Sequence, residues 1–341
     1  MNKKYSELAE LFRSEKTDEE ILDFLLNYHK NDIADMMAGM TEEERKRLYH
    51  LLGAQKVAEI FKYIEEPRKY IRELSVESAA RVISEMDSDD AVDLLEDLDP
   101  EEKEQIVRML DEDAKKDVKM LLSYDEEEIG SCMTTNYICI PENLTIKQAM
   151  SELVKQAGEN DNIMTIYVVD EKGVFAGAID LKDLIRAREN THLEDLVLKS
   201  YPYVTDHEKI DDCMDRILDY AEDSIPVLSE DKRILGVITS EDLIEMVDNE
   251  MGEDYAKLAG LTAEEDLKEP ILQSMKKRLP WLIILLFLGM AVSSVVGLFE
   301  NVVAVLPIVI CFQSLVLDMA GNVGTQSLAV TIRVLMDENL T

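Results

Sequence analysis

The sequence predicts a multidomain protein with an all-α N-terminal domain, a repeated α/β unit, a long connecting helix and an α-helical transmembrane domain. Apolar residues recur at three- and four-residue spacing through the first third of the chain, which is typical of amphipathic helices. A strand–strand–helix pattern then occurs twice, and near the end about 20 consecutive residues carry no charge, the length that a membrane-spanning helix needs. With 341 residues the chain is also too long for one ordinary core.

The charge of the chain is concentrated in its first part. The formal net charge is −36 at pH 7, and residues 271–341 hold four basic and four acidic side chains, so the first 270 residues carry the whole excess. Such an acidic surface attracts cations. It disfavours nucleic acid, whose affinity comes mainly from Lys and Arg on phosphates, and we therefore expect no nucleic-acid partner.

Residues 1–128 are predicted to form an acidic, superhelical stack of short helices. Helical spacing is clear at Ile21, Phe24 and Leu25. The stretches "GMTEEE" and "DLDPEEKEQIV" place Thr41 and Asp99 before acidic first turns. Both arrangements are typical of helix starts, because the cap side chain accepts a backbone hydrogen bond and the acids favour the positive end of the dipole.

An internal repeat follows the helical domain. The stretch "YVVDEKGVFAGAIDLKDLI" starts at Tyr167, and "PVLSEDKRILGVITSEDLI" starts at Pro226. The two align without gaps at an offset of 59 residues, with Gly177 opposite Gly236. Each copy reads as strand, charged turn, strand and helix, and each follows an amphipathic helix. Two such units are expected to pack as a pseudo-symmetric pair.

This pair of units resembles a tandem pair of CBS domains. The resemblance is specific, because the repeat lies within the chain itself. We assign the first CBS domain to residues 129–195 and the second to residues 196–249.

The C-terminal part is predicted to lie in a membrane. Residues 250–278 read as a connecting helix, and residues 279–341 as a partial transmembrane domain with two spans, the second beginning at Val302. Trp281 stands at the edge of the first span, where aromatic rings prefer the interface. Lys and Arg precede the first span and Arg333 follows the second, so the N-terminal domains are expected in the cytoplasm.

Polar residues occur within the second apolar segment, in "SLVLDMAGNVGTQSLAVTIRVL". Asp318, Asn322, Thr325 and Gln326 would be costly at membrane depth without a purpose. Their amide and hydroxyl oxygens suit Mg²⁺ or the water that it keeps. A helix–helix packing seam with interhelical hydrogen bonds explains the same residues equally well, and the glycines between them favour either close packing or a break in the helix.

The order of these parts resembles the MgtE family of magnesium channels along the whole chain. The resemblance is carried by "GNVGTQS" after two spans, the repeated unit, the acidic helical domain and the segment "EEIGSCMTTNYICI". Ile129 stands where that family usually has Ala.

The resemblance implies a homodimer in the cell inner (plasma) membrane, multi-pass, with a central Mg²⁺ pathway. The family's membrane domain has five helices, so about three are expected to be absent from this chain. The polar end of the second span would line the pathway with Asn322, Gly324, Thr325 and Gln326. The family closes this pathway when cytosolic Mg²⁺ is abundant, because ions bridge acidic groups between its cytoplasmic domains.

The carboxylates expected to hold these ions lie in two stretches. In the helical domain they are Asp89, Asp90 and Asp93, in "MDSDDAVDLLED". Opposite them we expect Asp242, Glu245, Asp248, Glu250, Glu253 and Asp254, in "SEDLIEMVDNEMGEDY". Of all these, Asp89, Asp93, Asp242 and Glu253 match the family's sensing positions. For any single acid, a solvated helix face or a place in a helix's first turn is the alternative.

The CBS resemblance also implies a nucleotide site. Gly236, Thr239 and Asp242 fit the family's motif for the ribose and phosphate of an adenine nucleotide such as ATP. In the first copy Asp180 stands where Thr or Ser is expected, and its carboxylate would repel phosphate.

No motif for covalent or acid–base catalysis is present, and the chain is not expected to be an enzyme. Two alternatives to an Mg²⁺-gated magnesium channel stay open. One is a membrane-tethered sensor of Mg²⁺ or nucleotide that does not transport. The other is a CBS-regulated transporter of another ion, but such proteins place their CBS domains after the membrane part. Mn²⁺ or Co²⁺ as cargo is not distinguished from Mg²⁺ by carboxylates alone.

Overall fold

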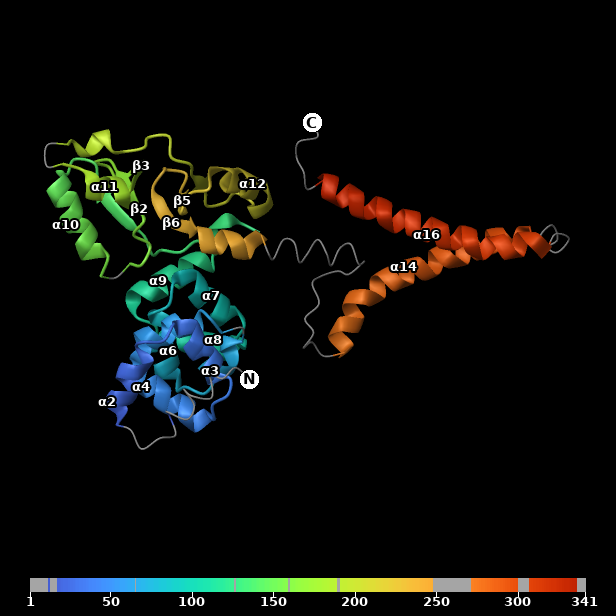
Figure 1. Ribbon diagram of the computed structural model, residues 1–341, viewed down its shortest axis with the longest axis horizontal. Coiled ribbons are helices and arrows are strands. Elements are labelled where there is room, and N and C mark those ends of the chain that lie inside the picture. Colours follow the sequence, from blue (N-terminus) through green and yellow to red (C-terminus); the bar gives the residue numbers. More distant parts are fainter. Residues whose placement is uncertain are drawn as a thin grey trace. The chain divides into compact units, whose positions relative to one another are not determined.

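The computed structural model divides the chain into two compact units, Met1–Leu243 and Ile244–Thr341, each of which is described by itself. Figure 1 shows the first unit as a group of helices and a mixed α/β part, and the second as two long helices. The described residues are Phe12 and residues 17–64, 66–125, 127–158, 160–188, 191–247, 271–299 and 307–335.

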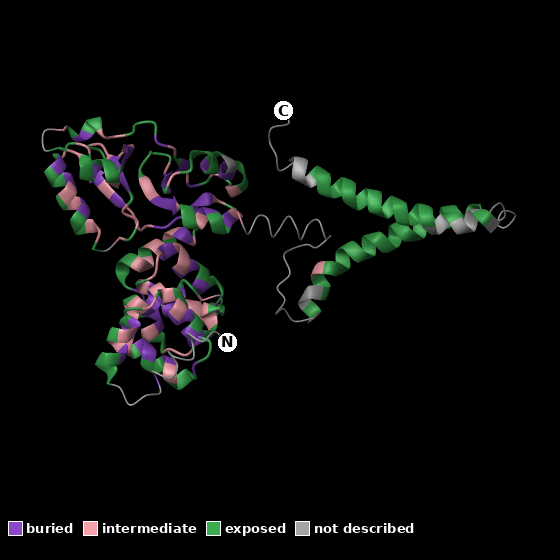
Figure 2. Ribbon diagram, viewed as in Figure 1, coloured by how far each residue is buried: buried purple, intermediate pink, exposed green. Residues whose placement is uncertain are grey.

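The predicted stack of short helices is confirmed in the N-terminal part of the first unit. Its helices are α2 (Asp18–Leu25), α3 (Lys30–Met37), α4 (Glu42–Phe61), α5 (Pro67–Ile71), α6 (Val76–Ser84), α7 (Ser88–Glu96), α8 (Pro100–Met109) and α9 (Glu112–Leu121). Their apolar faces meet in a core that includes the fully buried Ile21, Leu48 and Leu95, and Figure 2 shows this buried interior. We call this part the helical domain.

The predicted helix starts are confirmed, although the two caps work differently. Thr41 forms a capping box with Glu44, in which the Glu44 N–H donates to Thr41 Oγ1 at 3.3 Å and the Thr41 N–H donates to Glu44 at 2.8 Å. Asp99 occupies the N-cap position of α8 but makes no cap bond with its side chain. It accepts from Arg68 and Arg72 instead, and so ties α8 to α5.

The predicted repeat is confirmed as two three-stranded sheets. The first copy contains η1 (Ile129–Cys132), β1 (Ile138–Pro141), α10 (Ile146–Gln156), β2 (Thr165–Val169), β3 (Phe175–Asp180) and α11 (Leu181–Arg186). The second contains η2 (Leu193–Asp195), β4 (Val204–Thr205), α12 (Ile210–Tyr220), β5 (Ser224–Leu228), β6 (Ile234–Thr239) and a helix over residues 240–247. In each sheet the first two strands are parallel and the last two antiparallel.

The two copies exchange the segments that lead into them. Thr134, which precedes β1, pairs with Val237 in β6 of the second copy. Leu198, which precedes β4, pairs with Ala178 in β3 of the first copy. Ala178 and Val237 are equivalent at the offset of 59 residues, so the exchange follows the internal symmetry that the sequence predicts.

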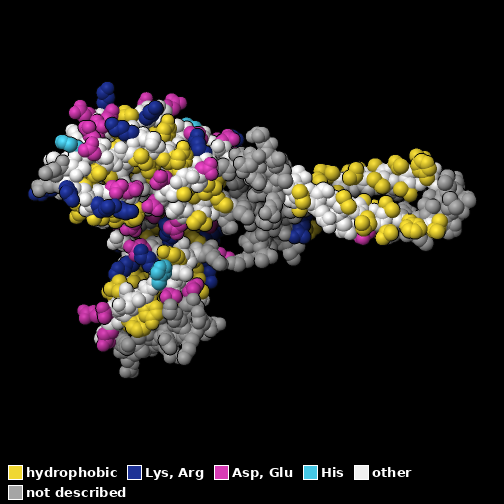
Figure 3. Space-filling view, turned by 45° about the horizontal axis from the view of Figure 1, so that its top comes forward, with side chains coloured by type: hydrophobic (Ala, Val, Ile, Leu, Met, Phe, Trp, Pro, Cys, Tyr) yellow, Lys and Arg dark blue, Asp and Glu magenta, His cyan; other side chains and the backbone are white. Residues whose placement is uncertain are grey.

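The second unit consists of α14 (Ile271–Leu298) and α16 (Pro307–Leu335). Among the residues searched, Met275–Leu298 is long and apolar enough to cross a membrane. Side chains of both helices are exposed wherever they are described, apart from a half-buried position near the start of α14, and Figure 3 shows hydrophobic side chains covering them. The first predicted span thus falls within α14, which begins already at Ile271. The second falls largely on α16, and its crossing of a membrane remains a prediction.

The polar segment of α16 is helical throughout. Asn322 donates to Asp318 at 3.5 Å, and the Thr325 hydroxyl donates to the carbonyl oxygen of Gly321 at 3.2 Å. Because α16 is continuous from Pro307 to Leu335, a helix broken at these glycines is wrong for this structure. Open space surrounds Gly321 and Gly324, which leaves room for another backbone to approach.

Candidate metal site

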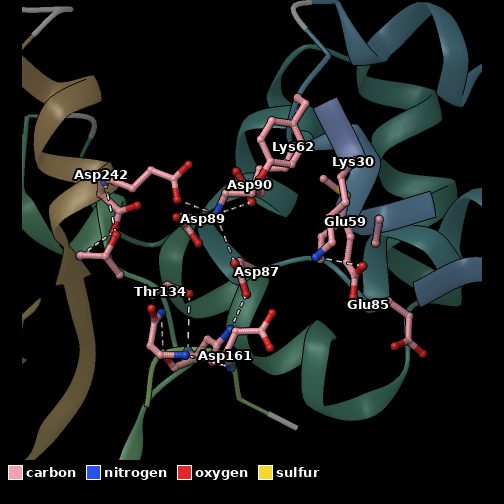
Figure 4. Close-up of a pocket in the computed structure, with 17 residues that line it drawn as sticks. Lys30, Glu59, Lys62, Glu85, Asp87, Asp89, Asp90, Thr134, Asp161 and Asp242 are labelled. Carbon is pink, nitrogen blue, oxygen red and sulfur yellow. Dashed lines mark hydrogen bonds and ion pairs between the residues drawn. The ribbon is translucent and has the colours of Figure 1, made fainter. Parts of the chain in front are cut away.

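An acidic cavity of about 230 Å³ lies where the helical domain meets the second repeat. Figure 4 shows side chains from both parts directed into it. Its acidic lining residues are Glu59, Glu85, Asp87, Asp89, Asp90, Asp161, Glu241 and Asp242. The described lysines that line it are Lys30 and Lys62. The cavity therefore brings together two stretches that are about 150 residues apart in the sequence and that repel each other by charge.

The start of α7 places three carboxylates at the cavity. Asp87 is the N-cap residue, and Asp89 and Asp90 follow in the first turn, where the helix dipole favours negative charge. One oxygen of Asp89, Oδ1, is buried and has no hydrogen-bond partner among the described residues. A buried carboxylate oxygen without a partner is costly, so this atom is a candidate ligand.

The pKa values of these aspartates report the same crowding. Burial, and then the nearby carboxylates of Asp242, Asp90 and Asp87, raise the pKa of Asp89 well above its usual range. Burial raises the pKa of Asp90 to about 7, although Lys62 opposes the shift. Burial also raises the pKa of Asp242, against the hydrogen bonds that it accepts. A nearby cation would favour the ionised forms of all three.

Lys62 supplies positive charge to the cavity. Its Nζ lies 3.6 Å from Asp87 Oδ2, 3.8 Å from Asp90 Oδ2 and 3.4 Å from Glu241 Oε2. Burial by itself lowers the pKa of Lys62, but the carboxylates of Asp90, Asp87 and Glu241 outweigh it and hold the pKa above its usual value. The ammonium group is therefore charged at neutral pH. Lys30, in contrast, pairs with Glu59 at 3.0 Å.

Hydrogen bonds fix the helical domain against the repeats beside the cavity. The Thr135 N–H donates to Ser88 Oγ at 2.9 Å, and the Thr135 hydroxyl donates to Asp117 at 2.8 Å. Asn136 Nδ2 donates to Asp87 Oδ1 at 2.7 Å. These bonds hold α7 and α9 against the segment before β1, which itself pairs with β6 of the second repeat, and we call them the docking contacts.

The residues of the predicted nucleotide motif have structural roles here. The Thr239 N–H donates to Asp242 Oδ2 at 2.7 Å, and the Asp242 N–H donates to Thr239 Oγ1 at 3.3 Å. Together they cap the helix over residues 240–247 in the manner of a capping box. A Cβ on Gly236 would lie 2.7 Å from the carbonyl oxygen of Thr134, so this glycine admits the exchanged segment. Thr239 and Asp242 also face the acidic cavity, where polyphosphate would be repelled. The nucleotide site predicted for the cleft between the two CBS copies stays a prediction.

The structure brings together only part of the predicted metal set. Asp89, Asp90 and Asp242 line the cavity. Asp93 is exposed on α7, and Glu245 is exposed on the helix over residues 240–247. Four predicted ligands lie outside the described residues: Asp248, Glu250, Glu253 and Asp254. Within the described residues, no three His, Cys, Asp or Glu side chains lie close enough to hold a metal directly.

Sequence reasoning missed several residues of the site, and four of them show why. Asp87 and Glu241 stood beside predicted ligands in the quoted stretches, and their charge was the available signal. Lys62 and Asn136 had no signal, because each becomes relevant only when the helical domain and the repeats come together.

Family models match most of the first unit. Residues 28–127 match the MgtE intracellular N domain, and residues 127–190 and 193–249 match the CBS domain. The magnesium transporter MgtE of Enterococcus faecalis is 39% identical over 337 residues, which are 98% of this chain and 74% of that protein. The chain spans 48% and 49% of the length of two further MgtE transporters.

Solved structures resemble the same part of the chain. The soluble part of a magnesium transporter aligns with a TM-score of 0.69 and 30% identity, over 72% of this chain and 98% of that one. The cytosolic domain of the Mg²⁺ channel MgtE, solved in complex with ATP, aligns with a TM-score of 0.63 and 27% identity, over 71% of this chain and 99% of that one. The sequence match runs along almost the whole chain and the fold match along its first unit, and the chain therefore belongs to the MgtE family of magnesium transporters.

Proposed function

We propose that this chain takes part in Mg²⁺ transport across a membrane and senses cytosolic Mg²⁺ at the cavity between its helical domain and its second CBS domain. The observation that supports this most directly is that Asp89 and Asp90 line the same cavity as Asp242 and Glu241. One oxygen of Asp89 is buried there without a hydrogen-bond partner among the described residues. Mg²⁺ bound among these oxygens would hold the two domains together and favour the closed pathway.

Charge repulsion determines which form of the protein Mg²⁺ favours. Without a divalent cation, the carboxylates of the two domains repel each other and favour separation. An ion that binds only the docked form stabilises that form by RT ln(1 + [Mg²⁺]/Kd) for each site. Docking is therefore a graded response to the cytosolic Mg²⁺ concentration.

The lining suits a hydrated ion. Mg²⁺ loses water reluctantly and is usually held by one or two carboxylates together with several retained waters. The cavity offers oxygen ligands and about 230 Å³ of space, but no preformed cluster among the described residues. Asp89 and Asp242 would then hold the ion partly through water. We do not include ATP at this cavity, although the relative's cytosolic domain was solved with it.

The membrane part of the proposal rests on α14 and α16. We propose a homodimer in the plasma membrane with its N-terminal domains in the cytoplasm, consistent with the apolar Met275–Leu298 helix. Asn322, Gly324, Thr325 and Gln326 of α16 would line the ion pathway. The ligands proposed on the connecting segment are Glu245, Asp248, Glu250, Glu253 and Asp254, and Asp93 would join them from α7.

A membrane-tethered sensor without transport is the second candidate. The observation that favours it is that the apolar helix Met275–Leu298 suffices to anchor the sensing domains to a membrane. Uptake of Mg²⁺ into proteoliposomes by this chain, compared with the full-length Enterococcus relative, separates the two. Transport by both supports the first proposal. A version of this chain with five spans then decides the other case: transport by it supports the channel, whereas no transport with Mg²⁺ binding retained supports the tethered sensor.

Calorimetric Mg²⁺ titration tests the cavity itself. We expect Asp89→Asn combined with Asp90→Asn to weaken Mg²⁺ binding at least about tenfold, since each change removes an anionic ligand. Asp211→Asn combined with Asp212→Asn removes the same charge from the exposed first turn of α12 and is the matched control. Equal weakening by both pairs would contradict a specific site and indicate a response to overall charge.

A further inference from the structure

Lys62 occupies the position from which a bound cation would act. It caps the C-terminus of α4 and lies between α7 of its own domain and Glu241 of the second CBS domain. Its three carboxylate contacts measure 3.4–3.8 Å, beyond the usual range of a good hydrogen bond. The ammonium group is thus shared among the carboxylates as a point charge and is bound tightly to none of them.

The contact to Glu241 makes Lys62 a bridge between domains. Asp87 and Asp90 belong to the helical domain, as Lys62 does, whereas Glu241 belongs to the second CBS domain. The Lys62 side chain is 29% exposed, so its flexible four-carbon stem has a path to solvent. A bridge that is monovalent, loosely held and able to leave has the properties of a replaceable counter-ion.

We propose that Lys62 acts as a tethered counter-ion that keeps the two domains loosely docked when Mg²⁺ is absent. When Mg²⁺ binds, the Lys62 ammonium moves away from Asp90 and Glu241, and the ion takes its place. This rests on the proposed function of the cavity and deepens it. A divalent ion carries twice the charge of the ammonium and reaches the Asp89 oxygen that Lys62 leaves without a partner. Lys62 would thereby fix how far the domains separate when Mg²⁺ is low.

Hydrogen exchange of the full chain in detergent, with chelator or with saturating MgCl₂ at equal ionic strength, tests this. The Thr135 amide reports docking, because it donates across the interface to Ser88. In chelator we expect Lys62→Met to speed exchange of residues 133–137 about fivefold, since the carboxylates then repel without compensation. In Mg²⁺ we expect wild-type protection, because the ion replaces the missing charge.

Two variants serve as controls. Lys62→Arg keeps the positive charge and should retain the protection seen in wild type with chelator. Lys30→Met removes a charge from the same cavity lining, but one that is paired with Glu59, and should leave the Thr135 amide unchanged. Unchanged exchange in α6 of the helical domain and in β5 of the second CBS domain shows that both parts of each variant fold.

The possible results separate this inference from the proposed function. If Lys62→Met stays unprotected even in saturating Mg²⁺, Lys62 is a structural tie and the inference is wrong. The inference is also wrong if Lys62→Met exchanges at the wild-type rate in chelator. In that case, protection of the wild type by Mg²⁺ would still support the cavity as a sensor. If wild-type exchange does not respond to Mg²⁺ at all, the proposed function fails and the inference with it.

Discussion

The two CBS copies follow one backbone plan but meet different neighbours. At the end of β3 in the first copy, Asp180 makes no cap bond, and Asp183 is exposed. At the equivalent place in the second copy, Thr239 and Asp242 bond to each other at the rim of the acidic cavity. The repeat thus supplies the same scaffold twice, but of these equivalent positions only Thr239 and Asp242 of the second copy are among the described residues that line the acidic cavity.

The glycines that admit the exchanged segments should show the largest effects. A Cβ on Gly177 would lie 2.5 Å from the carbonyl oxygen of Leu198, at a φ of +148°. A Cβ on Gly236 would lie 2.7 Å from that of Thr134, without a positive φ. We expect Gly177→Ala to cost about 3 kcal/mol of unfolding free energy and Gly236→Ala somewhat less, measured by denaturant unfolding.

Gly53→Ala is the control for this pair. Gly53 has a φ of +77° but open space where a Cβ would lie, so it should show backbone strain alone, about 1 kcal/mol. If all three substitutions cost the same, the close approach of the exchanged segments is not what requires glycine.

Equivalent aspartates of the two copies should differ in Mg²⁺ binding. We expect Asp242→Asn to weaken Mg²⁺ affinity about tenfold, or about 1.4 kcal/mol, because Asp242 faces the cavity. Asp183→Asn should leave the affinity unchanged, since Asp183 is exposed in the first copy and lines no part of the described cavity. Calorimetry of both variants is the measurement, and a loss in Asp183→Asn would remove the distinction between the copies.

The caps offer a smaller test of the same asymmetry. Thr239→Ala removes the hydroxyl that accepts from Asp242 and should cost about 1 kcal/mol of stability. Asp180→Thr gives the first copy a cap of the second copy's type and should stabilise it by a few tenths to about 1 kcal/mol. Thermal unfolding of both variants checks these signs, and a stabilising Thr239→Ala would show that the cap is strained.

The pH dependence should be the smallest of these effects. Because the pKa of Asp90 is raised to about 7, mainly by burial, Mg²⁺ must displace protons from the cavity at neutral pH. Mg²⁺ affinity should therefore rise a few-fold between about pH 6 and pH 8. Calorimetry in buffers of different ionisation enthalpy measures the released protons, and binding without proton release would contradict the raised pKa.

Without Mg²⁺, the unfolding free energy should change with pH in the direction opposite to the Mg²⁺ affinity. The native state holds protons on Asp89, Asp90 and Asp242 that the unfolded chain releases nearer its ordinary carboxyl pKa. The native state thus binds more protons, and the unfolding free energy should fall as the pH rises from about 4 to 7. Saturating Mg²⁺ should remove this decline.

Local patterns in the sequence predicted most of the fold. The repeat at an offset of 59 residues predicted both CBS copies. The Thr41 cap and the apolar spacing around Ile21 predicted the helical domain. These features are predictable because each depends on residues close together in the chain. The exchange of Thr134 and Leu198 between copies was not predicted, since nothing local marks it.

The site was predictable only in part of its acidic lining. Acid-rich stretches marked Asp89, Asp90 and Asp242, and the family resemblance selected among them. Lys62 and Asn136 were not predicted, because their roles depend on contacts between segments that are distant in the sequence. Exposed Asp93 and Glu245 show the converse, since helical spacing turns some acids of a cluster away from the cavity.

The central claim is that Mg²⁺ holds the helical domain against the second CBS domain. Small-angle X-ray scattering of residues 1–270, in chelator and in millimolar Mg²⁺ at equal ionic strength, tests it most directly. We predict a smaller radius of gyration in Mg²⁺, and no change when Asp89, Asp93, Asp242 and Glu253 are all neutralised. Equal ionic strength matters because simple screening also weakens like-charge repulsion. An unchanged wild-type radius, or equal compaction of the neutralised variant, would contradict the account.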